Sequence, residues 1–173
     1  MYKRQVLGYA INGFSERSPE FRDAVLAELN PRGKDFLRSA ATSCTGDSVL
    51  MWGFTNTRML TRTGESLSEI VERKPVVKET LERQNLGKAV PNAPVMMASS
   101  PSDDLISHDQ VRRTAGAYCS MGGTIDFVAA PGTATIPRTG IDHAVPLHLE
   151  MPVGLQYLFD RFEGKPAPTN CTA

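Results

Sequence analysis

The sequence contains no apolar run close to the roughly 18–20 residues that a membrane-spanning helix requires. Its first residues also lack the apolar segment of a secretory signal peptide. Lys and Arg number 19, Asp and Glu number 19, and no basic cluster with interleaved aromatic residues is present. We therefore expect neither a transmembrane segment nor a nucleic-acid partner, because nucleic acids are bound through a basic patch.

Cysteine is scarce and its number is odd. The three cysteines are Cys44, Cys119 and Cys171, so one stays unpaired if the other two form a disulfide. The sequence has no Cys-x-x-Cys motif and no pair of histidines four residues apart, and it therefore does not predict a metal site. For His108 and His148, solvent exposure or a capping role is the better interpretation.

Residues 1–5 resemble the translation of a transposase adapter used in shotgun DNA sequencing, read from a GTG start. We interpret them as a sequencing artefact and expect the gene to be cut at its 5′ end. The lack of a signal peptide then leaves the compartment open, because the segment that carries one can be missing. A cysteine lost with that segment would also explain the odd number.

Residues 6 to about 90 are helical in character. Ser18-Pro19-Glu20 supplies an N-cap, a proline at the first helical position and an acid in the first turn. Asn30-Pro31 starts a further helix, Thr45-Gly46-Asp47 is typical of a turn, and Ser66 to Glu69 forms a capping box. Such short helices need another surface on which to bury their apolar stripes, either the second half of the chain or a segment upstream of it.

The stretch from Val49 to Met59 is apolar but has no clear period. Two interpretations are open: packing in the core, and a flexible, methionine-rich wall of an apolar pocket. We favour the core, because an apolar stretch is more often core than site.

The second half, residues 91–173, alternates between strands and helices. Val95 to Ala98 is typical of a strand buried on both faces, a helix follows from Ser107, and Thr124 to Val128 alternates like a second strand. A loop then runs from Pro131 to Asp142, His143 follows it, and a last helix ending before Gly164 completes the chain. A helix between two strands predicts a right-handed parallel crossover, and hence an α/β fold in which both strand ends emerge on one edge of the sheet.

Candidate catalytic side chains follow each of these strands. Asp103 and Asp104 come after the first, and His143 comes after the second. Asp and then His are the last two members of the Ser, Asp, His order of α/β-hydrolases. The carboxylate holds the imidazole in the required tautomer and stabilises the imidazolium that forms during the reaction. A turn aspartate and a loop histidine are each unremarkable alone; their joint placement favours catalysis, although spacing does not separate Asp103 from Asp104.

The nucleophile of such a triad is missing. A nucleophile elbow requires Gly-x-Ser-x-Gly between a strand and a helix, and the sequence contains no complete match. The partial match Gly13-Phe14-Ser15-Glu16-Arg17 puts Glu and Arg where small residues must pack, and no strand precedes it. We therefore expect that Ser15 is not the nucleophile and that the serine and the oxyanion loop lie upstream.

Five phrases in this order carry a family resemblance, and they are "LNPRGKDFLRSAATSC", "NLGKAVPNAPVMM", "SDDLIS", "AYCSMGGTIDF" and "DHAVPLHLEMPVGLQYLFDRFEGKPAPTNC". With them the chain resembles the C-terminal half of the secretory lipase family, the lipase A-like α/β-hydrolases that cleave triacylglycerols and other fatty-acyl esters. The resemblance implies that residues 6–90 are a helical cap or lid and that residues 91–173 are the C-terminal part of the hydrolase core.

Carried over by position, the family's catalytic acid falls on Asp103 and its catalytic histidine on His143. The resemblance also implies a disulfide between Cys119 and Cys171, and it leaves Cys44 without the upstream cysteine that it would bond. The parent protein is then expected to be a secreted lipase or esterase that meets fatty-acyl esters at a lipid–water interface without a metal or organic cofactor. These residues alone are expected to be inactive.

Two rival hypotheses remain open from the sequence. The chain can be a complete, non-enzymatic α/β module that binds an apolar ligand or a partner, or the parent can be a peptidase or acyltransferase with the same triad. The spacing of Asp103 and His143 does not exclude a peptidase or acyltransferase.

Overall fold

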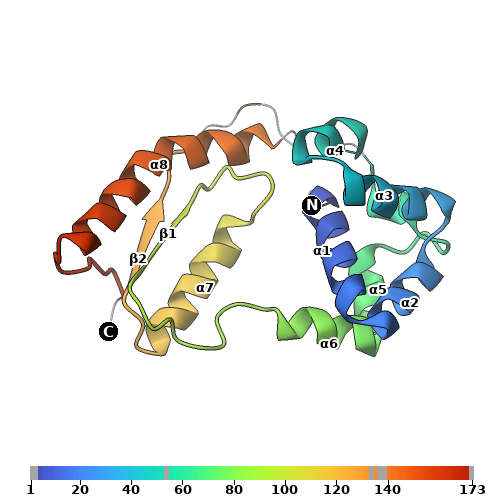
Figure 1. Ribbon diagram of the computed structural model, residues 1–173, viewed down its shortest axis with the longest axis horizontal. Coiled ribbons are helices and arrows are strands. Elements are labelled where there is room, and N and C mark those ends of the chain that lie inside the picture. Colours follow the sequence, from blue (N-terminus) through green and yellow to red (C-terminus); the bar gives the residue numbers. More distant parts are fainter. Residues whose placement is uncertain (1–3, 53–54, 133–134, 136–139, 172–173) are drawn as a thin grey trace. The chain divides into compact units, whose positions relative to one another are not determined.

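The computed structural model describes residues 4–52, 55–132, 135 and 140–171 (Figure 1). It contains two compact units, of which one comprises residues 2–85 and the other residues 86–173. The sequence predicts a change of architecture near residue 90, and the role of the first unit as a cap stays a prediction. Met1 to Lys3, which belong to the adapter-like start, lie outside the described residues.

The first unit is helical, as its caps predict. Its elements are α1 (Arg4–Arg17), α2 (Pro19–Glu28), α3 (Pro31–Thr42), α4 (Thr45–Trp52), the 3-10 helix η1 (Thr57–Leu60), α5 (Leu67–Arg73) and α6 (Pro75–Arg83). Side chains start three of them: Ser18 accepts from the Phe21 N–H, Asn30 accepts from the Gly33 N–H, and Ser66 forms a complete capping box. These bonds satisfy backbone donors that have no partner inside the helix.

One predicted turn in this unit is wrong. Thr45-Gly46-Asp47 forms the first turn of α4, and the Ser48 N–H donates to the Cys44 carbonyl at 3.1 Å. Asp47 places a carboxylate near the positive end of the helix dipole, which favours a helix start at the same residues that would suit a turn.

The core of the first unit gathers the apolar stripes of its helices. Its buried members are Ile11, Phe21, Val25, Leu29, Phe36, Leu37, Leu60 and Val77. Trp52 packs edge-on against Phe36 with ring centroids 5.4 Å apart, and its indole N–H donates to Ser39 Oγ. Met51 and Met59 are exposed. The core interpretation of the stretch from Val49 to Met59 therefore holds for Trp52 and fails for the two methionines, while Phe54 lies outside the described residues.

A glycine allows α3 to approach the end of η1. A Cβ atom on Gly33 would lie 2.2 Å from the carbonyl oxygen of Leu60, a backbone atom that cannot move aside. The Asn30 amide side chain donates to the carbonyls of Met59 and Thr61, each at 3.0 Å, and holds the same two segments together.

Gly33→Ala is expected to destabilise the first unit by about 1–3 kcal/mol, the usual range for overpacking a close contact. Gly13→Ala is the matched control, because its Cβ meets nothing within 4 Å and alanine favours a helix by up to about 1 kcal/mol. Urea unfolding followed by the fluorescence of Trp52, the single tryptophan, measures both variants. Equal stability of the two variants would contradict the packing argument.

A charged cluster joins the end of α2 to the junction between α5 and α6. The Glu28 carboxylate accepts from Arg73 and from Lys74, each at 2.8 Å. These bonds, that from Arg73 first, lower the pKa of Glu28 to about 2. Arg73 also bonds Glu65, so one guanidinium connects two carboxylates from different segments.

The second unit has the predicted α/β architecture. Its elements are β1 (Val95–Ser99), α7 (His108–Ser120), β2 (Ile125–Ala129) and α8 (Ile141–Phe162). The two strands pair in parallel, with Val95 opposite Ile125 and Ser99 opposite Ala129, and α7 connects them (Figure 1). Residues that follow the two strands therefore leave the sheet at the same end.

β1 is less buried than the sequence predicts. Val95, Met96 and Met97 are half-buried and Ala98 is exposed. The sheet has two strands among the described residues, so β1 has one strand neighbour. Its apolar composition is that of a central strand, and burial on both faces needs covering layers that this unit supplies only in part.

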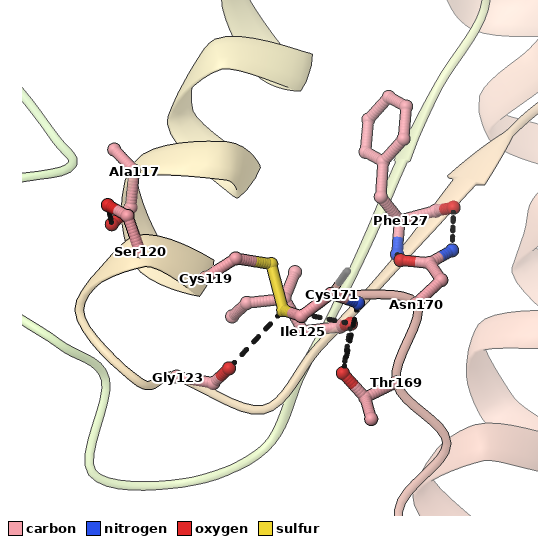
Figure 2. The surroundings of a disulfide bond; sticks show 9 residues. All are labelled: Ala117, Cys119, Ser120, Gly123, Ile125, Phe127, Thr169, Asn170 and Cys171. Carbon is pink, nitrogen blue, oxygen red and sulfur yellow. Dashed lines mark hydrogen bonds between the residues drawn. A yellow bond between two sulfur atoms is a disulfide. The ribbon is translucent and has the colours of Figure 1, made fainter. Parts of the chain in front are cut away.

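The C-terminal tail covers the edge of β2 that faces away from β1. A disulfide joins Cys119 at the end of α7 to Cys171, with the Cα atoms 5.4 Å apart (Figure 2). Beside it, the Asn170 N–H donates to the Ile125 carbonyl, and the Asn170 side chain bonds both the N–H and the carbonyl of Phe127. The tail thus satisfies polar backbone groups of an otherwise open sheet edge.

α8 presents a large apolar surface. Its exposed apolar side chains are Leu147, Leu149, Met151, Val153, Leu155, Leu158, Phe159 and Phe162, the last 84% exposed. Between α8 and β1 lies an apolar groove of about 520 Å³, lined mainly by aliphatic side chains of both elements. Across the part of the chain that the structure describes, no helix is both long and apolar enough to span a bilayer.

Candidate active site

The turn after β1 is fixed by serine side chains. Ser100 is almost fully buried, and its Oγ lies 3.0 Å from Ser102 Oγ and accepts from the Ser102 N–H. The Ser100 carbonyl accepts from the Asp103 N–H at 3.1 Å. Hydrogen bonds between residues so close in the chain stabilise a turn in preference to a helix or a strand. This turn leads directly to Asp103 and Asp104.

One carboxyl oxygen of Asp103 accepts hydrogen bonds from the backbone, and the other contacts His143. Its Oδ1 accepts from the N–H groups of Leu105 and Ile106, at 2.8 and 2.7 Å. Its Oδ2 lies 2.8 Å from His143 Nδ1. The carboxyl group is therefore oriented by three donors, and its side chain is 9% exposed.

The geometry of this pair determines the role of each imidazole nitrogen. A carboxylate oxygen can only accept a hydrogen bond, so Nδ1, which faces it, is the donor. The other nitrogen, Nε2, is then the atom that can accept a proton from a reactant. The His143 side chain is 35% exposed, so part of it is accessible from outside.

His143 lies in the first turn of α8, whereas the sequence predicts it before the last helix. Gly140 precedes the helix with a φ of 80°, and its carbonyl accepts from the N–H groups of His143 and Ala144. A left-handed backbone at this position is easily adopted only by glycine. The imidazole of His143 therefore projects from an α-helix and not from a loop.

Asp104 and Asp142 lie beside the pair and bond elsewhere. Asp104 Oδ2 accepts from the Gly140 N–H at 3.0 Å. Asp142 is 4% exposed, and its Oδ1 accepts from both the N–H and the hydroxyl of Thr135, each at 2.9 Å. Asp103 and Asp104, which spacing leaves equivalent, therefore have different partners: Asp103 bonds the His143 ring and Asp104 bonds the Gly140 backbone. Sequence reasoning missed these contacts, and the acids next to the predicted pair were the signal for them.

The other histidines take different positions. His108 begins α7, its Nδ1 lies 3.1 Å from the Ser99 carbonyl, and its ring packs against Phe127. This is a strand contact rather than solvent exposure, and the Ser107 side chain makes no capping bond. His148 is exposed on α8. Within the described ranges, no three His, Cys, Asp or Glu side chains form a group that could hold a metal.

Ser15 and the cysteines can also be placed. Ser15 lies inside α1, and the described residues before it, from Arg4, are helical, whereas a nucleophile elbow joins a strand to a helix. Cys119 and Cys171 form the disulfide that the family resemblance implies, and Cys44 is free and exposed.

Several known proteins are similar in sequence to this chain. A family model described as "Secretory lipase" matches residues 5–170. A Mycobacterium tuberculosis protein named as a probable inactive lipase is 29% identical over 86% of this chain and 31% of its own length. A secreted triacylglycerol lipase of Malassezia globosa is 22% identical over 93% of this chain and 34% of its own length. This chain therefore spans about a third of the length of these curated relatives.

Solved structures agree on the fold. The closed state of Candida antarctica lipase A matches 93% of this chain and 36% of its own chain, with a TM-score of 0.76 and 17% identity. A second structure of the same lipase gives a TM-score of 0.73 at 16% identity. At such low identity this likeness shows the fold alone, which is that of an α/β-hydrolase.

Proposed function

This chain belongs to the secretory lipase family, and we propose that it supplies the acid and the base of the Ser-His-Asp triad of an ester hydrolase. The serine then comes from a segment outside these 173 residues. The observation that carries the proposal is the 2.8 Å contact between Asp103 Oδ2 and His143 Nδ1. It leaves Nε2 as the atom that activates a nucleophile.

In the proposed reaction, His143 Nε2 takes the serine proton while the serine oxygen attacks the ester carbonyl. The resulting imidazolium gives this proton to the leaving alcohol, and an acyl-enzyme remains. Water then attacks the acyl group with His143 again as base, and the proton returns to the serine as the carboxylic acid leaves. Asp103 stays in place through both halves and stabilises the imidazolium.

The proposed substrates are triacylglycerols or other fatty-acyl esters, met at a lipid–water interface. The Malassezia globosa relative is named as a secreted triacylglycerol lipase, and we extend that substrate class and an extracellular location to the parent protein. The disulfide between Cys119 and Cys171 supports the location, because such bonds persist in oxidising compartments. We propose that residues 6–90 are the helical cap or lid segment of this family.

Two observations support a serine outside these residues. The sequence contains no complete Gly-x-Ser-x-Gly motif. The exposed apolar face of α8 and the groove beside β1 are surfaces that soluble proteins normally cover. Further strands of a sheet, next to β1, would cover them in a longer hydrolase.

The test has two arms. The 173-residue chain should not hydrolyse p-nitrophenyl esters, and Ser15→Ala should change nothing, because a base and an acid without a nucleophile have nothing to activate. The gene extended upstream should encode a Gly-x-Ser-x-Gly segment after a strand, and the longer protein should hydrolyse the same esters. Turnover by the short chain that Ser15→Ala abolishes would refute the proposal, as would a full-length gene without such a segment.

A second candidate function is a non-enzymatic module that binds an apolar ligand. The relative named as a probable inactive lipase and the 520 Å³ groove favour it. The upstream gene separates the two candidates, because only the hydrolase requires a serine elbow.

A further inference from the structure

The two adjacent aspartates of the acidic turn contact two different parts of one helix start. Asp103 bonds the imidazole of His143, whereas Asp104 bonds the backbone N–H of Gly140. Gly140 is the N-cap residue of α8, directly before Ile141. One turn therefore fixes both the histidine side chain and the backbone that carries it.

We propose that Asp104 and Asp142 are positioning residues that hold the first turn of α8 so that His143 stays in hydrogen-bond contact with Asp103. The inference rests on the proposed hydrolase function only for its effect on catalysis. The contacts themselves are independent of any reaction.

The first turn of α8 is held by backbone hydrogen bonds to Gly140. The Gly140 carbonyl accepts from the His143 N–H at 3.3 Å and from the Ala144 N–H at 3.0 Å. Gly140 and His143 thus belong to one hydrogen-bonded turn, and a shift of the Gly140 N–H moves the histidine with it. A hydrogen bond weakens steeply beyond its normal length, so even a small shift at Gly140 endangers the 2.8 Å contact.

Asp142, the neighbour of His143 in that turn, is also held by hydrogen bonds. Its buried carboxyl group accepts two hydrogen bonds from Thr135, one from the backbone and one from the hydroxyl. Burying a carboxyl group is costly without such donors. Asp142 therefore ties the first turn of α8 to Thr135, while Asp104 ties it to the acidic turn.

The experiment measures solvent exchange of the His143 Nδ1 proton by NMR in the ¹⁵N-labelled 173-residue chain. The signal is assigned by its loss in His143→Gln. Asp104→Ala should accelerate the exchange about tenfold, because the acceptor for the Gly140 N–H is lost. Asp104→Asn keeps an acceptor oxygen and should stay within about twofold of the wild type.

Asp109→Ala is the matched control. Asp109 is also an acid of this unit, but it lies exposed on α7, where it bonds Arg112 at 3.4 Å. If Asp104→Ala keeps its far-ultraviolet circular dichroism and exchanges at the rate of Asp109→Ala, the proposal is overturned. Should Asp104→Ala fail to fold, Asp104→Glu takes its place, since it keeps the charge and displaces the acceptor; wild-type exchange in Asp104→Glu would equally overturn the proposal.

The Asp142 contact has its own variant. Thr135→Val removes the hydroxyl donor and keeps the shape of the side chain, and it should accelerate the exchange about threefold. An unchanged rate would remove Asp142 from the proposal.

A kinetic readout separates this inference from the proposed function. In the extended, serine-bearing protein, Asp104→Ala should lower kcat about tenfold and leave KM within about twofold, because the histidine is misplaced while the substrate site is intact. An equal change of kcat and KM would contradict a positioning role. If the exchange results hold and the extended protein shows no hydrolysis, the proposed function fails and the positioning of His143 stands.

Discussion

Replacing His143 with alanine in the extended, serine-bearing protein is expected to lower kcat for p-nitrophenyl butyrate by about 10⁴–10⁶-fold. Alanine cannot take the serine proton or return it to the leaving alcohol, so both halves of the proposed reaction lose their base and their acid. The measurement is the steady-state hydrolysis rate with the folded state checked by circular dichroism. Asp103→Asn should cost about 10⁴-fold, because the tautomer of the imidazole is no longer imposed.

His148→Ala is the control for this experiment. His148 lies on the same helix and is exposed, so its loss should change kcat by less than about twofold. If His143→Ala kept more than a tenth of the wild-type kcat, the Asp103–His143 pair would not be the catalytic pair, whatever its geometry.

Loss of the Cys119–Cys171 disulfide is expected to destabilise the second unit by about 4 kcal/mol. The value follows from the chain entropy of a loop with a sequence separation of 52 residues. Cys119→Ser and Cys171→Ser together should also free the tail, which leaves the Phe127 N–H without the Asn170 acceptor. Hydrogen exchange of the Phe127 amide, measured as a function of urea concentration, reports both the loss of stability and the release of the tail.

Cys44→Ser is the control for the disulfide, because Cys44 is free and exposed and its replacement should change the free energy of unfolding by less than about 0.5 kcal/mol. Trp52 lies in the helical unit, so its fluorescence tells whether the effect stays in the second unit. Protection of the Phe127 amide that survives in the double serine variant would show that backbone contacts alone hold the tail.

Much of the helical unit follows from local chemistry. Ser18, Asn30 and Ser66 start helices because each side chain accepts a bond from a backbone N–H that has no other partner. The error at Thr45-Gly46-Asp47 has a physical cause. The residue types that are common in turns, such as Asp, Thr and Gly, are also found in the first turn of a helix. The residues that follow then decide whether a helix continues.

The candidate site was predictable in part. A helix between two strands places Asp and His at one end of a parallel sheet, and the structure brings Asp103 and His143 within hydrogen-bond distance. The choice between Asp103 and Asp104 was not predictable from spacing. It depends on which carboxyl group the N–H groups of Leu105 and Ile106 orient.

Patterns in the sequence predict the parallel strands with their connecting helix, several helix starts, and the two residue types that meet at the end of the sheet. These features follow from local patterns, namely capping side chains at helix starts and the spacing of apolar residues. The folded structure was needed to find the separate contacts of Asp103 and Asp104, the position of His143 inside α8, and the tail along β2. Each of these depends on groups that lie far apart in the chain, such as Asp104 and Gly140, and no local pattern records such a pairing.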